Sequence, residues 1–281
     1  MNVKLLEPYG YCFGVKNALK QMNKIIDIYK TSHIVLIGPL VHNKNTNDLL
    51  KSKGVEIVEN LDENFLLDYL NNINDQTIIV FSCHGHFKSL ENVVIARKIK
   101  YFDLVCPIVN KNIVKLKENN KKYVYFIGDK NHIESKYLFS YCEKIETDFK
   151  QIQNNALILN QTTIKSDDYF KAIKNFDNVS EVEIFKNICN EPFNRYESLK
   201  KICKKEKFDY VFVVGDSTSA NTKNLLNIYQ ISTNNTNIKI INDKKELESF
   251  DFSKISNVLV LSGTSTSNSD VLDVYNYIKT K

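Results

Sequence analysis

The strongest constraint on the fold is a unit of sequence that occurs three times along the chain. Each unit begins with a cysteine, continues with apolar residues at helical spacing, and reaches a β-branched and aromatic run that stops at a glycine. The runs are "HIVLIG", "YVYFIG" and "YVFVVG". The units start at Cys12, Cys106 and Cys189 and reach Gly38, Gly128 and Gly215 after 26, 22 and 26 residues. Continuous runs of this kind are typical of strands buried in parallel sheets, so the repeat predicts an α/β fold.

A second apolar run closes each unit and ends in polar residues. These runs are "TIIVFSCHG", "NALILNQTT" and "NVLVLSGTS". Polar residues stand at their ends and also four residues beyond each glycine: His84, Thr162, Ser265, His42, His132 and Ser219. Because ligands of open parallel sheets bind beyond the carboxyl ends of the strands, we expect these side chains to line one site.

The repeat predicts three similar α/β lobes in a pseudo-threefold, triangular arrangement around a shared cavity. The expected lobes are residues 14–105, 106–190 and 191–281, with the N-terminal segment 1–13 joined to the last. Since 43% of the 281 residues are hydrophobic, each lobe can bury a core.

Charge and hydropathy exclude two classes of partner. The net charge of +5 comes from short lysine clusters such as "NNKKYVY" and "NDKKELE", which are interleaved with acids and amides as on solvated surfaces. This pattern argues against nucleic-acid binding. No apolar run approaches the roughly 20 residues that a membrane span requires, so we expect a cytoplasmic protein without a membrane partner. Six cysteines without close pairing fit a reducing compartment.

The cysteine positions indicate a metal centre without identifying the metal. The three repeat cysteines stand before helices, as Pro107 after the second one indicates, and could hold zinc or an iron–sulfur cluster. The sequence "CHGH" has the spacing of half a zinc site, but no second half is evident. We therefore expect Cys83 to face the core and His84 to lie at the rim. Cys142 and Cys203 are expected to be small core side chains.

Nine ordered motifs resemble those of the IspH/LytB family. They are "YCFGVKNAL", "GPLVHN", "CHG", "CPIVNK", "GDKNHIE", "NQTT", "NICN...NR", "GDSTSAN" and "SGTSTS", and they extend from Cys12 to Ser265. The resemblance implies reduction of 4-hydroxy-3-methylbut-2-enyl diphosphate to isopentenyl and dimethylallyl diphosphate. This is the last step of the non-mevalonate isoprenoid pathway. It also implies an external electron donor of the ferredoxin or flavodoxin type.

The resemblance also assigns roles to individual residues. It implies a [4Fe–4S] cluster at the centre of the three lobes, held by Cys12, Cys106 and Cys189, with one iron lacking a protein ligand. It implies that Glu134 supplies a proton. The implied substrate-binding positions are His42, His84, His132, Thr162, Ser219, Ala220, Asn221 and Ser265. Such side chains can hold a diphosphate in a chain with only two arginines.

The chain departs from the family pattern beside several motifs. Ala220 replaces a serine, Val105 replaces a threonine, a glycine is missing from "ESKYLF", and "EP" replaces Ala-Thr after the third cysteine. Because the expected cluster ligands and the acid are all present, we expect these changes to affect substrate affinity and phosphate geometry more than the reaction itself. Two alternatives follow. One is a non-catalytic diphosphate-binding or iron-sensing relative, and the other is a zinc-dependent or metal-free α/β transferase or binding module.

Overall fold

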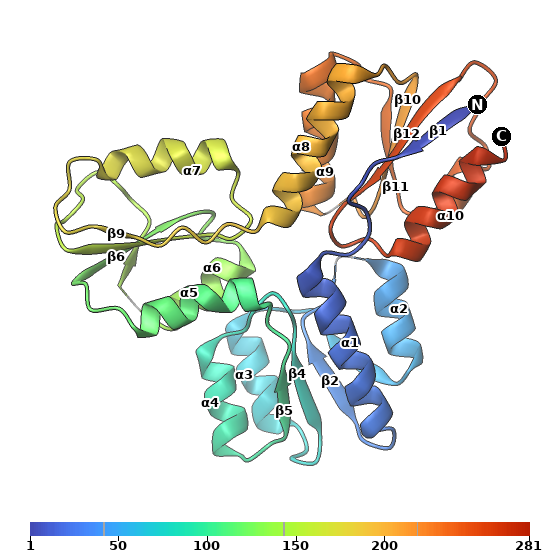
Figure 1. Ribbon diagram of the computed structural model, residues 1–281. Coiled ribbons are helices and arrows are strands. Elements are labelled where there is room, and N and C mark those ends of the chain that lie inside the picture. The colour runs from blue at the N-terminus through green and yellow to red at the C-terminus, as the bar shows by residue number, and fades with distance from the viewer. Residues whose placement is uncertain (42, 143, 218) are drawn as a thin grey trace. The chain divides into compact units, whose positions relative to one another are not determined.

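Parallel sheets form the framework of the protein. The computed structural model describes residues 1–41, 43–142, 144–217 and 219–281 (Figure 1). Within these residues twelve strands form three four-stranded sheets, and all neighbouring strands are parallel. The predicted α/β class with three lobes is therefore confirmed. We call the sheets first, second and third in the order of the central strands along the chain.

The first sheet has the order β3-β2-β4-β5. Its strands are β2 (Ile34–Ile37), β3 (Val55–Val58), β4 (Ile78–Phe81) and β5 (Tyr101–Asp103). The helices before and between these strands are α1 (Phe13–Ile28), α2 (Lys44–Ser52), α3 (Glu63–Asn72) and α4 (Lys88–Ala96).

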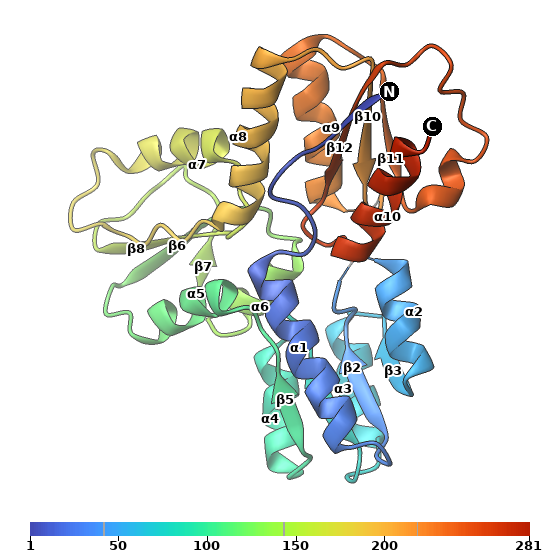
Figure 2. The ribbon, with the colours of Figure 1, turned by 45° about the vertical axis from the view of Figure 1, so that its right-hand side comes forward.

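The second sheet has the order β7-β6-β8-β9. Its strands are β6 (Tyr123–Ile127), β7 (Ile145–Glu146), β8 (Ala156–Asn160) and β9 (Glu183–Ile184). Its helices are α5 (Pro107–Lys117), α6 (Ile133–Phe139), α7 (Ser166–Ile173) and the 3₁₀ turn η1 (Lys174–Phe176). In Figure 2, α7 lies on one face of this sheet, and α5 and α6 lie on the other.

The third sheet has the order β1-β12-β10-β11. Its strands are β1 (Asn2–Leu5), β10 (Tyr210–Val214), β11 (Ile238–Ile241) and β12 (Asn257–Ser262). Its helices are α8 (Asn190–Lys205), α9 (Ala220–Thr233), α10 (Asn268–Lys279) and the 3₁₀ turn η2 (Lys244–Leu247).

Each of these sheets buries side chains on both faces, as the continuous apolar runs predict. In β10, Val211 and Val213 pack with Leu199 of α8 and Leu225 of α9, whereas Phe212 packs with Val271 of α10. Figure 1 shows the same division, with α8 and α9 on one side of the third sheet and α10 on the other.

The chain forms two compact units. One unit, the third-sheet unit, comprises Met1–Lys16, Val41–Leu49 and Asn190–Lys281. The other, the two-sheet unit, comprises Asn17–Leu40 and Leu50–Cys189. Within the two-sheet unit, the backbone N–H of Lys88 donates to Ser140 Oγ at 2.9 Å, and the Tyr141 hydroxyl donates to Glu91 at 3.0 Å. These bonds join the first lobe to the second.

The strand before each repeat cysteine lies at one edge of a sheet. β5 pairs with β4 before Cys106, β9 pairs with β8 before Cys189, and β1 pairs with β12 before Cys12. Each cysteine therefore stands where the chain leaves one sheet and enters the helix that precedes the next central strand.

Candidate active site

The three repeat cysteines share one backbone environment. In each case the cysteine N–H donates to the carbonyl oxygen of the residue that lies two positions beyond the end of the neighbouring central strand. The bonds run from Cys12 to Thr264 (3.0 Å), from Cys106 to Cys83 (3.0 Å) and from Cys189 to Thr162 (2.7 Å). The first bond lies in the third-sheet unit and the other two lie in the two-sheet unit. The three units of the sequence repeat thus share the same backbone hydrogen bond at their cysteine.

This environment refines one equivalence expected from the sequence. Thr162 corresponds to Cys83 and Thr264, whereas His84 and Ser265 each lie one residue further along. Cys83 itself is buried and its thiol donates to the Leu40 carbonyl, as expected for a core side chain.

Helix N-termini face the cysteine thiols. The backbone N–H of Val15 lies 3.5 Å from Cys12 Sγ, and α5 begins at Pro107 directly after Cys106. Burial raises the pKa of the Cys106 thiol, and the N–H groups of Ile108 and Val109 act in the opposite direction. Half-buried thiols at helix N-termini suit thiolate ligation, because these N–H groups stabilise negative sulfur. The donor set therefore fits an iron–sulfur cluster.

The three repeat cysteines are divided between the two compact units. Cys12 belongs to the third-sheet unit, while Cys106 and Cys189 belong to the two-sheet unit. Across residues 1–41, 43–142, 144–217 and 219–281, no cluster of three or more His, Cys, Asp or Glu side chains has metal-binding geometry.

Glu134 is a buried acid held by Thr162. Its side chain is only 4% exposed, on the first turn of α6. The backbone N–H of Thr162 donates to Glu134 Oε1 at 2.8 Å, and the Thr162 hydroxyl donates to Oε2 at 2.9 Å. Burial raises the pKa of Glu134 to about 7, although the Thr162 hydrogen bonds and the charge of His84 oppose this rise. The carboxyl can thus hold a proton at neutral pH.

Two histidines flank Glu134 in the two-sheet unit. His84 follows β4, where burial lowers its pKa and the Glu134 carboxylate acts to raise it. His132 is the N-cap of α6, and its Nδ1 accepts from the Glu134 N–H at 3.3 Å. The structure thus brings together four of the predicted site residues, His84, His132, Glu134 and Thr162.

A second group of polar side chains lies in the third-sheet unit. Ser219 is the N-cap of α9, and Asn221 Nδ2 donates to Thr264 Oγ1 at 2.8 Å. The Ser265 and Thr222 hydroxyl oxygens are buried and have no hydrogen-bond partner among the described residues. Unpartnered hydroxyls near strand ends can serve a polar ligand.

The glycines at these strand ends allow the loops to pack closely. A Cβ at Gly215 would lie 2.8 Å from Thr222 Oγ1, and a Cβ at Gly263 would lie 2.5 Å from the same atom. Any larger residue would fill the space around the hydroxyl. The predicted His42 lies outside the described residues, and Ala220 is the first residue of α9.

The sequence did not indicate three residues that shape this group. Arg195 is 2% exposed and donates to the carbonyls of Gly10, Ser262 and Gly263. The Tyr196 hydroxyl donates to Asn221 Oδ1 at 3.2 Å, and Thr264 accepts from both Cys12 and Asn221. The available signals were the motifs "NICN...NR", which ends at Arg195, and "SGTSTS", which contains Thr264.

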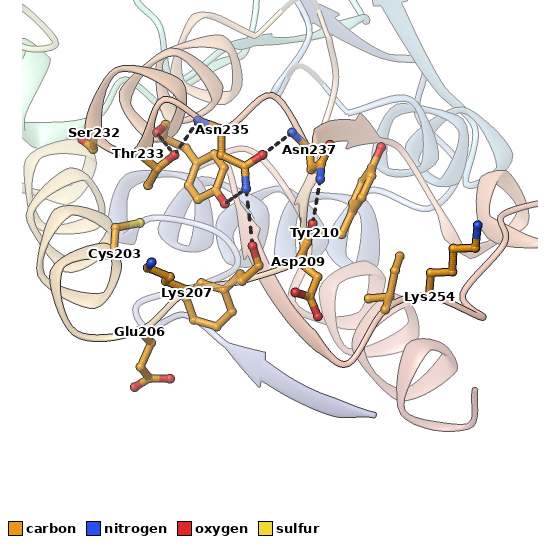
Figure 3. A pocket seen from close by; sticks show the side chains of 13 residues that line it. Cys203, Glu206, Lys207, Asp209, Tyr210, Ser232, Thr233, Asn235, Asn237 and Lys254 are labelled. Atoms are coloured by element: carbon orange, nitrogen blue, oxygen red, sulfur yellow. Dashed lines mark hydrogen bonds between the residues drawn. The ribbon is translucent and has the colours of Figure 1, made fainter.

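A cavity of about 800 Å³ lies at the amino ends of the strands of the third sheet (Figure 3). It is lined by residues that precede β10, β11 and β12, among them Asp209, Asn237 and Ile255. The predicted site residues lie at the carboxyl ends of the strands, so this cavity is distinct from the site. No helix in the described part of the chain has the length and apolar character needed to cross a membrane.

Known proteins resemble the chain over nearly its full length. The sequence profile described as LytB protein matches residues 3–279. The 4-hydroxy-3-methylbut-2-enyl diphosphate reductase of a Nitratiruptor species is 30% identical over 293 residues, which cover 99% of this chain and 98% of that protein.

Two solved structures share the fold. The E-1-hydroxy-2-methyl-but-2-enyl-4-diphosphate reductase of Plasmodium falciparum matches with a TM-score of 0.79 at 24% identity, covering 98% of this chain and 87% of that one. An (E)-4-hydroxy-3-methyl-but-2-enyl diphosphate reductase, described as the terminal enzyme of the non-mevalonate pathway, matches with a TM-score of 0.72 at 24% identity, covering 100% and 99%. From the repeated cysteine geometry, the three parallel sheets and these matches, we conclude that the chain belongs to the LytB protein family.

Proposed function

We propose that the protein reduces 4-hydroxy-3-methylbut-2-enyl diphosphate to isopentenyl and dimethylallyl diphosphate. The observation that carries this proposal is the threefold-equivalent environment of Cys12, Cys106 and Cys189, each at a helix start and each anchored through its N–H. Membership of the LytB family and the name of the Nitratiruptor relative support it.

The reaction requires two electrons and two protons, because the allylic hydroxyl leaves as water. A [4Fe–4S] cluster held by Cys12, Cys106 and Cys189, with one iron lacking a protein ligand, would supply the electrons and a Lewis acid. We propose that an external donor of the ferredoxin or flavodoxin type delivers electrons, and that the protein works in the cytoplasm.

Glu134 is the proposed proton donor. Its raised pKa keeps a substantial fraction of the carboxyl protonated at neutral pH, and Thr162 fixes the orientation of both oxygens. A carboxyl with a pKa near the working pH can both give a proton and recover it from solvent. Thr162 also accepts the Cys189 N–H through its carbonyl, so one residue contacts both the proposed proton donor and a proposed cluster ligand, which supports this assignment.

The diphosphate would be held by hydroxyl, amide and imidazole groups. The proposed binding residues are His42, His84, His132, Thr162, Ser219, Ala220, Asn221 and Ser265. The unpartnered hydroxyl of Ser265 supports this assignment, because a buried hydroxyl without a partner is costly unless a ligand satisfies it. Gly215 and Gly263 keep Cβ atoms away from the Thr222 hydroxyl, which therefore stays available as a polar group at these strand ends.

The test is anaerobic purification followed by turnover. We expect a brown protein that contains iron and sulfide and that converts the hydroxylated diphosphate when a chemical reductant is supplied. An intact cluster with bound diphosphate and no turnover would instead favour the non-catalytic or iron-sensing relative. A colourless protein with zinc and no sulfide would favour the zinc-dependent or metal-free α/β transferase or binding module.

A further inference from the structure

A ring of three buried asparagines occupies the second lobe. Asn112 lies in α5, Asn160 ends β8, and Asn187 lies between β9 and Cys189, and each is at most 7% exposed. Asn112 Nδ2 donates to the Asn160 carbonyl at 2.8 Å, Asn160 Nδ2 to the Asn187 carbonyl at 3.0 Å, and Asn187 Nδ2 to Asn112 Oδ1 at 3.0 Å. Buried amides are retained where every group has a partner, so this ring is a specific element of the structure.

The ring holds the segment that leads to Cys189. The Asn160 side chain pairs with both backbone groups of Asn187, since Asn160 Oδ1 also accepts the Asn187 N–H at 3.0 Å. Phe185 N–H donates to the Ile158 carbonyl before this point, and Cys189 N–H donates to the Thr162 carbonyl after it. Phe185, Asn187 and Cys189 are therefore each hydrogen-bonded to residues near or just beyond the end of β8.

The Asn187 side chain carries this restraint to a second cysteine. Besides its bond to Asn112, Asn187 Nδ2 donates to the Ile108 carbonyl at 2.8 Å. Ile108 is the second residue of α5, two positions after Cys106. One amide group thus connects the segment before Cys189 to the first turn of the helix that follows Cys106.

The other two lobes have no such connection at the corresponding position. Two residues before the other repeat cysteines stand Gly10 and Leu104, whose N–H groups donate to Ser262 Oγ and to the Phe81 carbonyl. In all three lobes the backbone N–H at this position donates a hydrogen bond. Glycine and leucine, however, have no polar side chain that could bond to a helix. The amide link is specific to the pair Cys106 and Cys189.

We propose that Asn187 is a positioning residue that fixes Cys189 relative to Cys106, so that both thiols are preset to hold the iron–sulfur cluster. The inference rests on the proposed function, because the cluster is part of it. Groups that orient metal ligands commonly change metal affinity by about 10- to 100-fold when they are removed. Loss of this link is expected to affect cluster retention more than folding.

Asn187→Ala tests the proposal, because it removes the bonds to Ile108 and Asn112 and spares the backbone pairing with Asn160. Asn112→Val is the matched control, since it opens the same ring but leaves the bond from Asn187 to Ile108. Asn187→Asp keeps the size of the side chain while removing its two N–H donors. Folding is checked by circular dichroism. The measured quantities are the anaerobic rate of iron release to a chelator and the electron paramagnetic resonance spectrum of the cluster.

We expect Asn187→Ala and Asn187→Asp to release iron about 10- to 100-fold faster than the parent, with a changed spectrum, and Asn112→Val to stay close to the parent. Parent-like release from both Asn187 variants would overturn the inference while leaving the proposed function intact. Equal acceleration in Asn112→Val would also overturn it, because the effect would then be general loosening. A parent without iron and sulfide would overturn the proposed function and this inference together.

Discussion

At the residue scale, burial of the Glu134 carboxyl determines whether this group is protonated at neutral pH. Glu134 would be an ordinary solvated acid on most helix surfaces, but here the core raises its pKa to about 7 while Thr162 supplies two donors. The burial favours the protonated form and the two donors favour the carboxylate. The balance leaves a group that can exchange its proton near neutral pH.

Glu134→Gln is expected to lower turnover by about 10²- to 10⁴-fold while sparing substrate binding. The glutamine can still accept the Thr162 N–H and can donate to the Thr162 hydroxyl, so the local structure should persist. It has no proton to transfer, and the loss therefore falls on the transition state. The measurement is anaerobic turnover and substrate affinity at matched iron content.

Glu118→Gln, at an exposed acid beyond the end of α5, serves as the control and should behave like the parent. If Glu134→Gln turned over substrate at the parent rate, the proton would have to come from water or from the substrate diphosphate.

The pH dependence of turnover offers a second prediction at this scale. Because Glu134 must be protonated to donate, the parent rate should fall as pH rises through about 7. Thr162→Val removes the hydroxyl donor that stabilises the carboxylate, so the pKa of Glu134 should rise and the falling limb should move to higher pH. Thr162→Ser keeps the hydroxyl and should keep the profile. A Thr162→Val profile that moved to lower pH would contradict this assignment.

At the residue scale the sequence named candidate groups but did not indicate how they pair. Glu134, Thr162 and His84 were all candidates, but the contact between Glu134 and Thr162 spans 28 positions and depends on how α6 packs beside β8. Asn160, Asn187 and Arg195 lie within the quoted motifs, but their contacts were not predicted. Their side chains act on backbone groups of distant segments, and the sequence does not indicate which segments these are.

At the element scale, the strand ends of the third sheet depend on one buried cation. Arg195 of α8 donates to the carbonyls of Gly10, Ser262 and Gly263, which surround the backbone anchor of Cys12. The carbonyl oxygens and the nearby charge of Glu191 stabilise the guanidinium. Burial lowers the pKa of Arg195, but arginine keeps its charge in proteins.

Arg195→Met is expected to destabilise the protein by about 2–5 kcal/mol, because it leaves buried carbonyl groups without donors. Arg97→Met is the matched control, since Arg97 is the other arginine and its side chain is 27% exposed in an ion pair with Asp75. Arg97 also donates to the carbonyls of Leu70 and Ile73, but its side chain is partly exposed, so water can replace the lost donors and the control should lose much less. Urea unfolding of the iron-free proteins measures both, and equal losses would show that Arg195 has no special role.

The six central strands could be predicted, and the six short edge strands could not. β2, β4, β6, β8, β10 and β12 lie within the apolar runs of the repeat. The other strands have two to four residues and mixed burial, such as Ile145–Glu146 in β7. They are strands because a central strand offers them unpaired backbone groups, so their formation depends on tertiary structure.

At the scale of the whole molecule, the three lobes repeat one arrangement, and the boundaries near residues 105 and 190 remain a proposal. The compact units divide the chain differently, since the N-terminal strand and Val41–Leu49 belong with the third sheet. We propose that the functional molecule uses all three cysteines in one site.

Replacement of Cys12, Cys106 or Cys189 by serine should therefore cause the same loss of iron and colour, although the three residues lie far apart in sequence. Serine is a poor ligand for iron compared with thiolate. Cys142→Ser and Cys203→Ser are controls, because these side chains pack in the cores of the second and third lobes. Iron and sulfide analysis after anaerobic purification measures the outcome. A cluster lost in Cys142→Ser and kept in Cys106→Ser would refute the equivalence of the repeats.

The pairing of β1 with β12 has a consequence for how the protein is made. Asn2 lies opposite Asn257, so β1 cannot pair until β12, 255 positions later in the chain, has been synthesised. At the usual elongation rate of about 5–20 residues per second, this delay is about 10–50 s. Val3 and Leu5, which later pack in the third-sheet core, stay exposed on the nascent chain during that interval. A chaperone that covers short apolar segments would therefore act on β1. A fusion that hides β1 would leave β12 without its neighbouring strand.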